Sequence, residues 1–206
     1  MVRVEATMRR RGVSIDRLVA MLRLCLLTLL LMPLLALTNG ALAAEGVDIT
    51  QAHLESSDDG VKLSASFAFE LNHGLEDAIN RGLPLYFTTQ VDIRRPRWYW
   101  FDEQSIAASE TVRLSYNVLT RQYHAAILGR LQQSFSSLDD ALSLIRRPSR
   151  WLIADKGALK IGESYAVAVR MHLDLAQLAK PFQVNAINNS DWRLSSDWKT
   201  FVYKAE

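Results

Sequence analysis

Alternating apolar and polar positions dominate the chain beyond residue 46 and predict β-strands. Between Val61 and Phe69 every odd position is apolar and most even positions are polar, the period-2 pattern of a strand that turns its odd face into a core. The segment Tyr165–Leu173 repeats this pattern. Shorter or less regular runs predict further strands at 47–54, 85–93, 112–118, 122–128, 151–153, 184–187 and 192–203, roughly seven to nine strands in all.

Two short segments carry helical spacing instead of alternation. One follows Asn72 and the other follows Ser137, residue types whose side chains cap the free N–H groups at a helix start. Apolar residues recur three and four positions apart in both segments, at Leu75, Ala78 and Ile79 and at Leu138, Ala141, Leu142 and Ile145. The sequence therefore predicts two short helices, together with one helical turn at 175–178 and a polar link without a strand at 105–110.

The order of these elements predicts a fold class. Turn signals such as Asp59-Gly60 recur at short spacing, and the strand–helix–strand alternation of parallel sheets is missing. We therefore expect one mainly β domain at residues 44–206, an antiparallel β-sandwich of the immunoglobulin-like class with two short helices.

Residues 1–43 have the composition of a leader. Several arginines precede the apolar run Leu24–Leu37, and Ala41-Leu42-Ala43 supplies the small residues of a cleavage site. The apolar run is shorter than the roughly 20 residues that a spanning helix needs. The pattern predicts a signal peptide and export to the periplasm or cell envelope. The alternative is an uncleaved N-terminal signal/anchor helix, with inner-membrane association through residues 18–37.

Charge and cysteine content narrow the classes of function. The whole chain has a net charge of +2, but the leader holds six arginines against two acidic residues, which leaves −2 for residues 44–206. A nearly neutral domain argues against nucleic acid as a partner. The single cysteine, Cys25, lies in the leader, so the domain has no disulfide and no cysteine metal site.

Sequence motifs for catalysis are missing. The chain has no glycine-rich phosphate loop, no nucleophile elbow and no His-Glu-x-x-His zinc motif. Its four histidines are scattered singly, and the acidic pairs Asp58-Asp59 and Asp139-Asp140 fit a hairpin turn and a helix N-terminus. We therefore expect a protein that is not an enzyme and that holds no metal and no cofactor.

An aromatic and basic stretch is the strongest candidate for function. Three arginines surround Pro96, and the four consecutive aromatic residues 98–101 follow. Because Pro96 lacks a backbone donor, the strand must end, bulge or lie at an edge there. Tryptophan, tyrosine and arginine anchor protein interfaces, although such rings can instead plug the end of a sandwich. The candidate partner-binding residues are Arg94, Arg95, Arg97, Trp98, Tyr99, Trp100, Arg121 and Tyr123.

A second basic group surrounds Pro148. Arg146, Arg147 and Arg150 lie at the end of the second predicted helix, where positive charge suits the helix dipole. We interpret this group as a solvated basic patch.

Several motifs together resemble a known family. They are Gly82-Leu83-Pro84-Leu85, Arg95-Pro96-Arg97-Trp98-Tyr99-Trp100, Leu114-Ser115-Tyr116, Leu119-Thr120-Arg121-Gln122-Tyr123, Ser137-Leu138-Asp139-Asp140-Ala141-Leu142 and Asp191-Trp192-Arg193-Leu194-Ser195-Ser196-Asp197-Trp198. With them the chain resembles, over about residues 47–203, a proteobacterial family of exported proteins known as domain of unknown function 4390. The resemblance implies a gene near two-component sensor kinases and supplies no reaction, cofactor or catalytic residue.

Three functions are compatible with these patterns. The favoured one is a non-catalytic, membrane-associated module of the bacterial envelope that binds an unidentified envelope or inner-membrane protein, as an accessory to a two-component sensor system. The alternative is a carrier of a lipid or other apolar ligand, which requires an elongated apolar cavity. The third is an envelope glycan-acting enzyme, which requires two facing carboxylates in a cleft.

Overall fold

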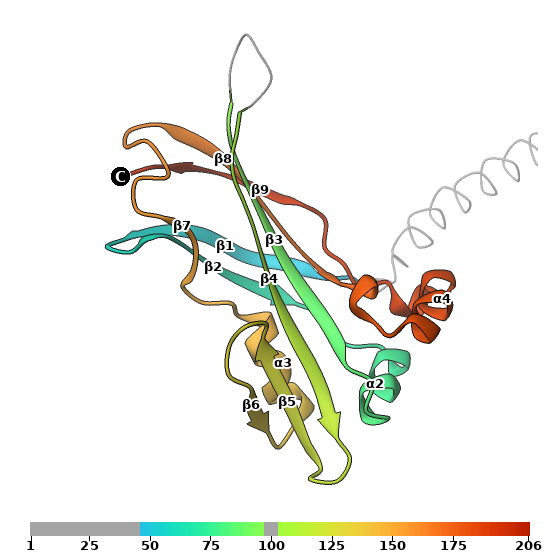
Figure 1. Cartoon of the computed structure of the whole chain (residues 1–206). Coiled ribbons are helices and arrows are strands. Elements are labelled where there is room, and N and C mark those ends of the chain that lie inside the picture. The colour runs from blue at the N-terminus through green and yellow to red at the C-terminus, as the bar shows by residue number, and fades with distance from the viewer. Residues whose placement is uncertain (1–45, 97–102) are drawn as a thin grey trace, which may run out of the picture. The chain divides into compact units, whose positions relative to one another are not determined.

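The computed structural model describes residues 46–96 and 103–206, all within the second of the chain's two units, Ala44–Glu206 (Figure 1). The strands are β1 (Asp48–Ser57), β2 (Gly60–Ala68), β3 (Leu85–Arg95), β4 (Glu103–Asn117), β5 (Gln122–Ile127), β6 (Gln133–Phe135), β7 (Trp151–Asp155), β8 (Ser164–Leu173) and β9 (Lys199–Lys204). The helices of the described residues are α2 (His73–Asn80), α3 (Leu138–Arg146) and α4 (Lys180–Asn188), with short 3-10 turns η1 (Leu175–Gln177) and η2 (Ser190–Trp192).

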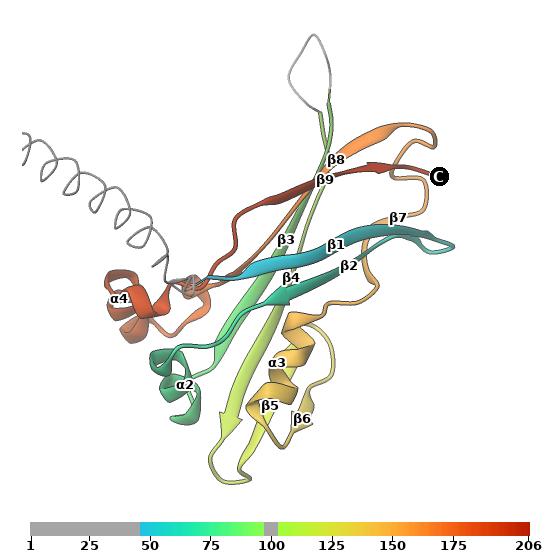
Figure 2. The ribbon, with the colours of Figure 1, turned by 180° about the vertical axis from the view of Figure 1, so that it is seen from behind.

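The nine strands in the described part of the chain form two antiparallel sheets, which confirms the prediction of a mainly β domain. The smaller sheet has the order β1-β2-β7 and the larger one the order β6-β5-β4-β3-β8-β9 (Figures 1 and 2). The strands β3 to β6 follow one another as neighbours, whereas β8 and β9 extend the sheet beyond β3. All pairs within both sheets are antiparallel.

Alternate side chains of both sheets meet in one apolar core. The odd positions of β2 are buried, as predicted, and include Leu63 and Phe67. From the larger sheet β3 contributes Phe87 and Val91 to the same cluster. The rings of Phe69 and Phe87 stack with their centroids 6.0 Å apart. The smaller sheet is therefore held against the larger one by hydrophobic burial.

Both predicted helices form where their caps indicate. The Asn72 side chain accepts a hydrogen bond of 3.0 Å from the N–H of Leu75 at the start of α2. The Ser137 hydroxyl accepts one of 3.1 Å from the N–H of Asp140 at the start of α3. Each cap satisfies a backbone donor that the first helical turn leaves free. The predicted turn at 175–178 is also present, as η1.

The predicted strand at 184–187 is wrong, because this segment belongs to the third helix, α4. Short apolar runs do not distinguish a strand from a helix by their period. Pro181 stands in the first turn of α4, where its missing N–H costs nothing and its fixed φ favours a helix start. The expected number of two short helices is therefore too low. The predicted strand 192–203 is also too long, since Trp192 belongs to η2 and β9 begins at Lys199.

The predicted polar link at 105–110 is wrong as well. These residues are part of β4, which pairs with β3 between Glu103 and Leu114, for example Ala107 with Asp92 and Ala108 with Val91. Pairing with β3 decides the structure of this segment, which local composition alone does not. As expected, β3 ends before Pro96, and its register shifts between Ile93 and Arg94.

No helix in the ranges 46–96 and 103–206 is both long and apolar enough to cross a bilayer.

His172 on β8 carries a buried polar atom. Its Nδ1 is enclosed and finds no hydrogen-bond partner in the described part of the chain. Burial lowers the pKa of His172 below its ordinary value of 6.5, and the nearby Arg170 guanidinium lowers it further. The folded protein therefore favours the neutral ring.

The stability of the protein should fall as the pH drops below about 6.5, because the unfolded chain takes up a proton there that the folded chain still excludes. Between about pH 7 and about pH 5.5, the urea midpoint of the natural chain should fall by more than that of His172→Gln, which has lost the titrating group. Equal falls in the two proteins would show that His172 does not contribute.

Candidate functional site

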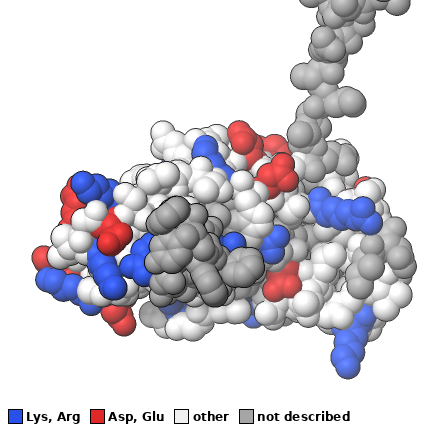
Figure 3. All heavy atoms as spheres, turned by 90° about the horizontal axis from the view of Figure 1, so that it is seen from above, with Lys and Arg blue, Asp and Glu red and all other residues white. Residues whose placement is uncertain are grey.

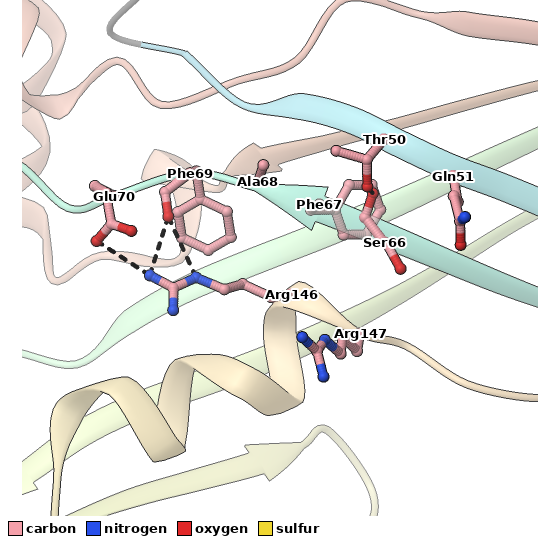
Figure 4. Close-up of a pocket in the computed structure, with 9 residues that line it drawn as sticks. All are labelled: Thr50, Gln51, Ser66, Phe67, Ala68, Phe69, Glu70, Arg146 and Arg147. Carbon is pink, nitrogen blue, oxygen red and sulfur yellow. Dashed lines mark hydrogen bonds and ion pairs between the residues drawn. The ribbon is translucent and has the colours of Figure 1, made fainter. Parts of the chain in front are cut away.

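The candidate site is a groove of about 700 Å³ that runs along β2 beside the C-terminal end of α3 (Figure 4). It is lined by Thr50, Gln51, Ser66, Phe67, Ala68, Phe69, Glu70, Arg146 and Arg147. A hollow of about 160 Å³ shares Gln51, Ser66 and Arg147 with it and continues to Pro148 and Ser149. The two hollows therefore adjoin each other along β2.

The groove exists because β7 is shorter than β2. β2 has nine residues and β7 has five, and their pairing reaches only from Gly60 to Leu63 of β2. Beyond it, the N–H of Ala65 donates to the carbonyl of Pro148 at 3.0 Å. Proline has no N–H to return to the Ala65 carbonyl, so the ladder ends there. Among residues 46–96 and 103–206, no strand pairs with this side of β2 beyond that point.

The backbone of Phe67 faces this open edge. Along a strand, successive residues direct their N–H and C=O groups to opposite neighbours. The N–H of Ala65 and the C=O of Phe69 both point away from β1, as their contacts with Pro148 and Arg146 show. Phe67 lies between them and shares their direction. Its side chain is buried, so Phe67 lines the groove with its backbone.

Arg146 closes one end of the groove. Its Nε and Nη2 donate to the Phe69 carbonyl at 3.2 and 3.0 Å, and its guanidinium also pairs with Glu70 (Figure 4). A further ion pair joins the guanidinium to Asp139. The same group lies 5.4 Å from the centre of the Phe69 ring. Only 17% of the Arg146 side chain is exposed. The interpretation of Arg146 as part of a solvated patch is therefore wrong, because α3 ends against the edge of β2.

Arg147 is the free cation of the groove. Its backbone N–H bonds to Ser143 at the end of α3, and its side chain is exposed. Among the residues that the structure describes, none forms an ion pair or hydrogen bond with its guanidinium. The carboxylate of Glu70 is engaged by Arg146. The groove therefore presents one uncompensated positive charge, which suits a carboxylate.

Two of the sequence-predicted site residues lie at the end of β3. Arg94 and Arg95 pair across the sheet with Gln104 and Glu103. The Arg94 side chain is 53% exposed, and its Nη2 lies 3.5 Å from the carboxylate of Asp92. Four further candidates (Arg97, Trp98, Tyr99 and Trp100) lie outside the described residues, so the aromatic part of this rim stays a prediction.

Arg121 and Tyr123 lie at the opposite end of β4. Tyr123 pairs with Tyr116, which is twelve positions from Gln104 along β4, or about 40 Å at about 3.3 Å per residue. The Tyr123 hydroxyl donates to Asn80 at 2.8 Å, and burial raises its pKa. Arg121 is exposed at a φ of 54°. The structure therefore does not bring these two residues together with Arg94 and Arg95.

Groups for acid–base or metal chemistry are sparse. The described residues contain no cluster of three or more histidine, cysteine, aspartate or glutamate side chains suited to a metal ion. Burial raises the pKa of Glu110 on β4, while Arg130, with its Nη2 at 3.3 Å from that carboxylate, opposes the rise. Glu110 does not line the groove. Its ion pair gives it a structural role.

A second hollow of about 550 Å³ lies between α2 and the start of α4. Its lining is Gly74, Asp77, Ala78, Arg81, Gly82, Leu83, Pro84, Phe182 and Trp192. Phe182 is 43% exposed. Elsewhere the surface mixes both signs of charge: on the face shown in Figure 3, Lys and Arg lie beside Asp and Glu.

In the part of the chain that the structure describes, fold and groove define a mainly β domain of two antiparallel sheets in which β2 extends beyond its shorter neighbour β7. Residues 44–202 match the family described as Domain of unknown function (DUF4390), and the chain belongs to this family. The resemblance inferred from its motifs is thereby confirmed. Comparison with curated proteins and with solved structures gave no match.

The groove was missed by sequence reasoning. The signals were present, because the alternation beginning at Val61 extends through Phe69 whereas the apolar run after Pro148 is short. Two arginines stand directly before that proline, where the segment that leads into β7 diverges from the edge of β2. Nothing in the sequence, however, places α3 beside β2.

Proposed function

We propose that this protein is a non-catalytic binding module of the bacterial cell envelope, which holds a partner protein in the groove between β2 and α3. The observation that carries this proposal is the combination of open backbone groups at Phe67 with the uncompensated charge of Arg147. Backbone groups bind any extended chain, and a guanidinium selects a carboxylate. The partner therefore contributes an acidic segment.

The chemistry of the lining supports binding rather than catalysis. The single carboxylate in it, Glu70, is paired with Arg146. The Thr50 hydroxyl donates to the Ser66 carbonyl at 3.0 Å, so it is committed to the sheet. An activated nucleophile needs an adjacent general base, and the lining of the groove itself offers no histidine. His53 lines the adjoining hollow and is engaged by Glu55 at 3.0 Å.

The leader pattern supports the cellular location. We place the domain in the periplasm, with the leader removed after residue 43 or retained as an inner-membrane anchor. The partner is an envelope or inner-membrane protein, and a two-component sensor system is the assembly that the family resemblance suggests. The shared core supports the finer architecture of an immunoglobulin-like β-sandwich. The rim from Arg94 to Trp100 would be a second surface of this domain that contacts the partner.

The test is a photo-cross-link from the groove in cells that naturally produce the protein. A photoreactive residue replaces the exposed Gln51, and the yield of the adduct is compared in the natural, Arg147→Glu and Arg113→Glu backgrounds. Arg113 is an exposed arginine on β4, away from the groove, and serves as the matched control. We expect Arg147→Glu to lower the yield about tenfold and Arg113→Glu to leave it unchanged. Equal yields in all three would refute the proposal.

A further inference from the structure

We infer that the partner's acidic segment binds in extended form and adds a short strand to the open edge of β2. This inference rests on the proposed function, because it concerns the same groove and specifies how the groove is filled. Strand addition uses main-chain hydrogen bonds for affinity and side-chain contacts for selectivity. Both kinds of group are present beside Phe67.

The backbone edge of β2 is accessible to an incoming strand. Natural proteins protect sheet edges with charged side chains, bulges, proline or a covering segment. Here the covering segment leaves the edge at Pro148, and the outward-facing residues Ser64, Ser66 and Ala68 are small. These side chains leave the backbone accessible from the groove. A donor and an acceptor on Phe67 can together form the closely spaced bond pair of an antiparallel ladder.

Two structural limits define the length of the added strand. Pro148 accepts the N–H of Ala65 on one side of Phe67, and Arg146 occupies the carbonyl of Phe69 on the other. The open ladder is therefore centred on a single residue. So short a ladder binds weakly by its backbone alone, and the charge of Arg147 must supply selectivity.

Charge also distinguishes two possible occupants of the groove, a segment of another protein and a second copy of this chain. An antiparallel pair of two β2 edges centred on Phe67 would bring the Arg147 side chains of both copies into one shared groove. Like charges at short distance oppose such a dimer. An acidic segment, in contrast, gains an ion pair with Arg147. The occupant is therefore an acidic stretch of another protein.

The experiment tethers the segment so that weak binding is still observed. A Gly/Ser linker of about 30 residues, with a root-mean-square span of about 30 Å, joins the C-terminus of the full chain to the sequence Thr-Val-Glu-Val-Thr. Control segments carry Lys or Pro in place of the central Glu, and the unextended chain is the reference. Amide hydrogen exchange at Phe67 is measured by NMR.

We expect the Glu segment to slow exchange of the Phe67 amide at least about tenfold, the Lys segment about threefold or less, and the Pro segment not at all. In Arg147→Glu the order of the Glu and Lys segments should reverse. Unchanged exchange with the Glu segment, or equal protection by all three, would overturn strand addition. Protection that rises with the concentration of the unextended chain would identify a second copy as the occupant and also overturn it.

The two proposals fail separately. Cross-linking that depends on Arg147, without protection at Phe67, retains a binding groove but rejects the added strand. Protection by the tethered segment, without dependence on Arg147 in cells, retains a strand-accepting edge but rejects the proposed function.

Discussion

Replacing Phe87 by alanine should lower the free energy of unfolding by about 3–5 kcal/mol, the range typical of a buried phenylalanine. Phe87 lies on β3 with 1% of its surface exposed, and its ring stacks on Phe69, which directly follows β2. The substitution removes the ring at the place where side chains of the two sheets meet. The resulting cavity would be lined by side chains that cannot collapse without moving a sheet.

Urea unfolding followed by tryptophan fluorescence measures this loss. Phe182→Ala is the matched control, because Phe182 is 43% exposed and should cost less than about 1 kcal/mol. Phe87→Leu should fall between the two. Similar midpoints for Phe87→Ala and Phe182→Ala would mean that the core between the sheets does not hold the domain together.

Regular alternation was sufficient to predict strands. The segments Val61–Phe69 and Tyr165–Leu173 bury the face that their patterns indicate, since a strand in a two-layer core has one dry side. The caps at Asn72 and Ser137 fixed both helix starts for an equally local reason: each side chain bonds to a backbone N–H three residues away.

The errors concern segments whose structure depends on distant partners. Residues 105–110, predicted as a polar link, form a strand because β3 supplies a hydrogen-bonding partner. The apolar run at 184–187 is helical, because Pro181 starts a helix and Ala186 is buried in the core. Local composition predicts neither outcome, since burial and pairing are set by the rest of the fold.

The candidate site depends even more on tertiary structure. In the sequence, Arg146 and Arg147 are neighbouring arginines with the same chemistry. In the fold one is paired and mostly buried, and the other is exposed in the groove. This difference arises from the contact between Arg146 and Phe69, which are 77 residues apart in the chain. The candidate partner-binding residues show the opposite case: they were predicted to form one site, but β4 separates Arg121 and Tyr123 from Arg94.

Arg146 affects both the stability of the domain and the shape of the groove. Its guanidinium, together with the buried Ile145, holds the last turn of α3 against the sheet, and it also occupies the Phe69 carbonyl that would otherwise extend the open ladder. A strand edge that is open at one residue accepts a short segment, whereas a longer open edge invites indiscriminate pairing. Arg146 therefore limits what the groove can bind.

Replacing Arg146 by alanine should accordingly lower the free energy of unfolding by about 2–3 kcal/mol, because it leaves the Phe69 carbonyl without its charged donor and removes two ion pairs. Arg147→Ala should change it by less than about 0.5 kcal/mol, since that side chain is exposed. Arg146→Lys should recover only part of the loss, because an ammonium cannot reproduce the guanidinium fork. Urea midpoints of the three variants measure this order. Equal stabilities of Arg146→Ala and Arg147→Ala would contradict a stabilising role of Arg146 at the contact between α3 and the sheet.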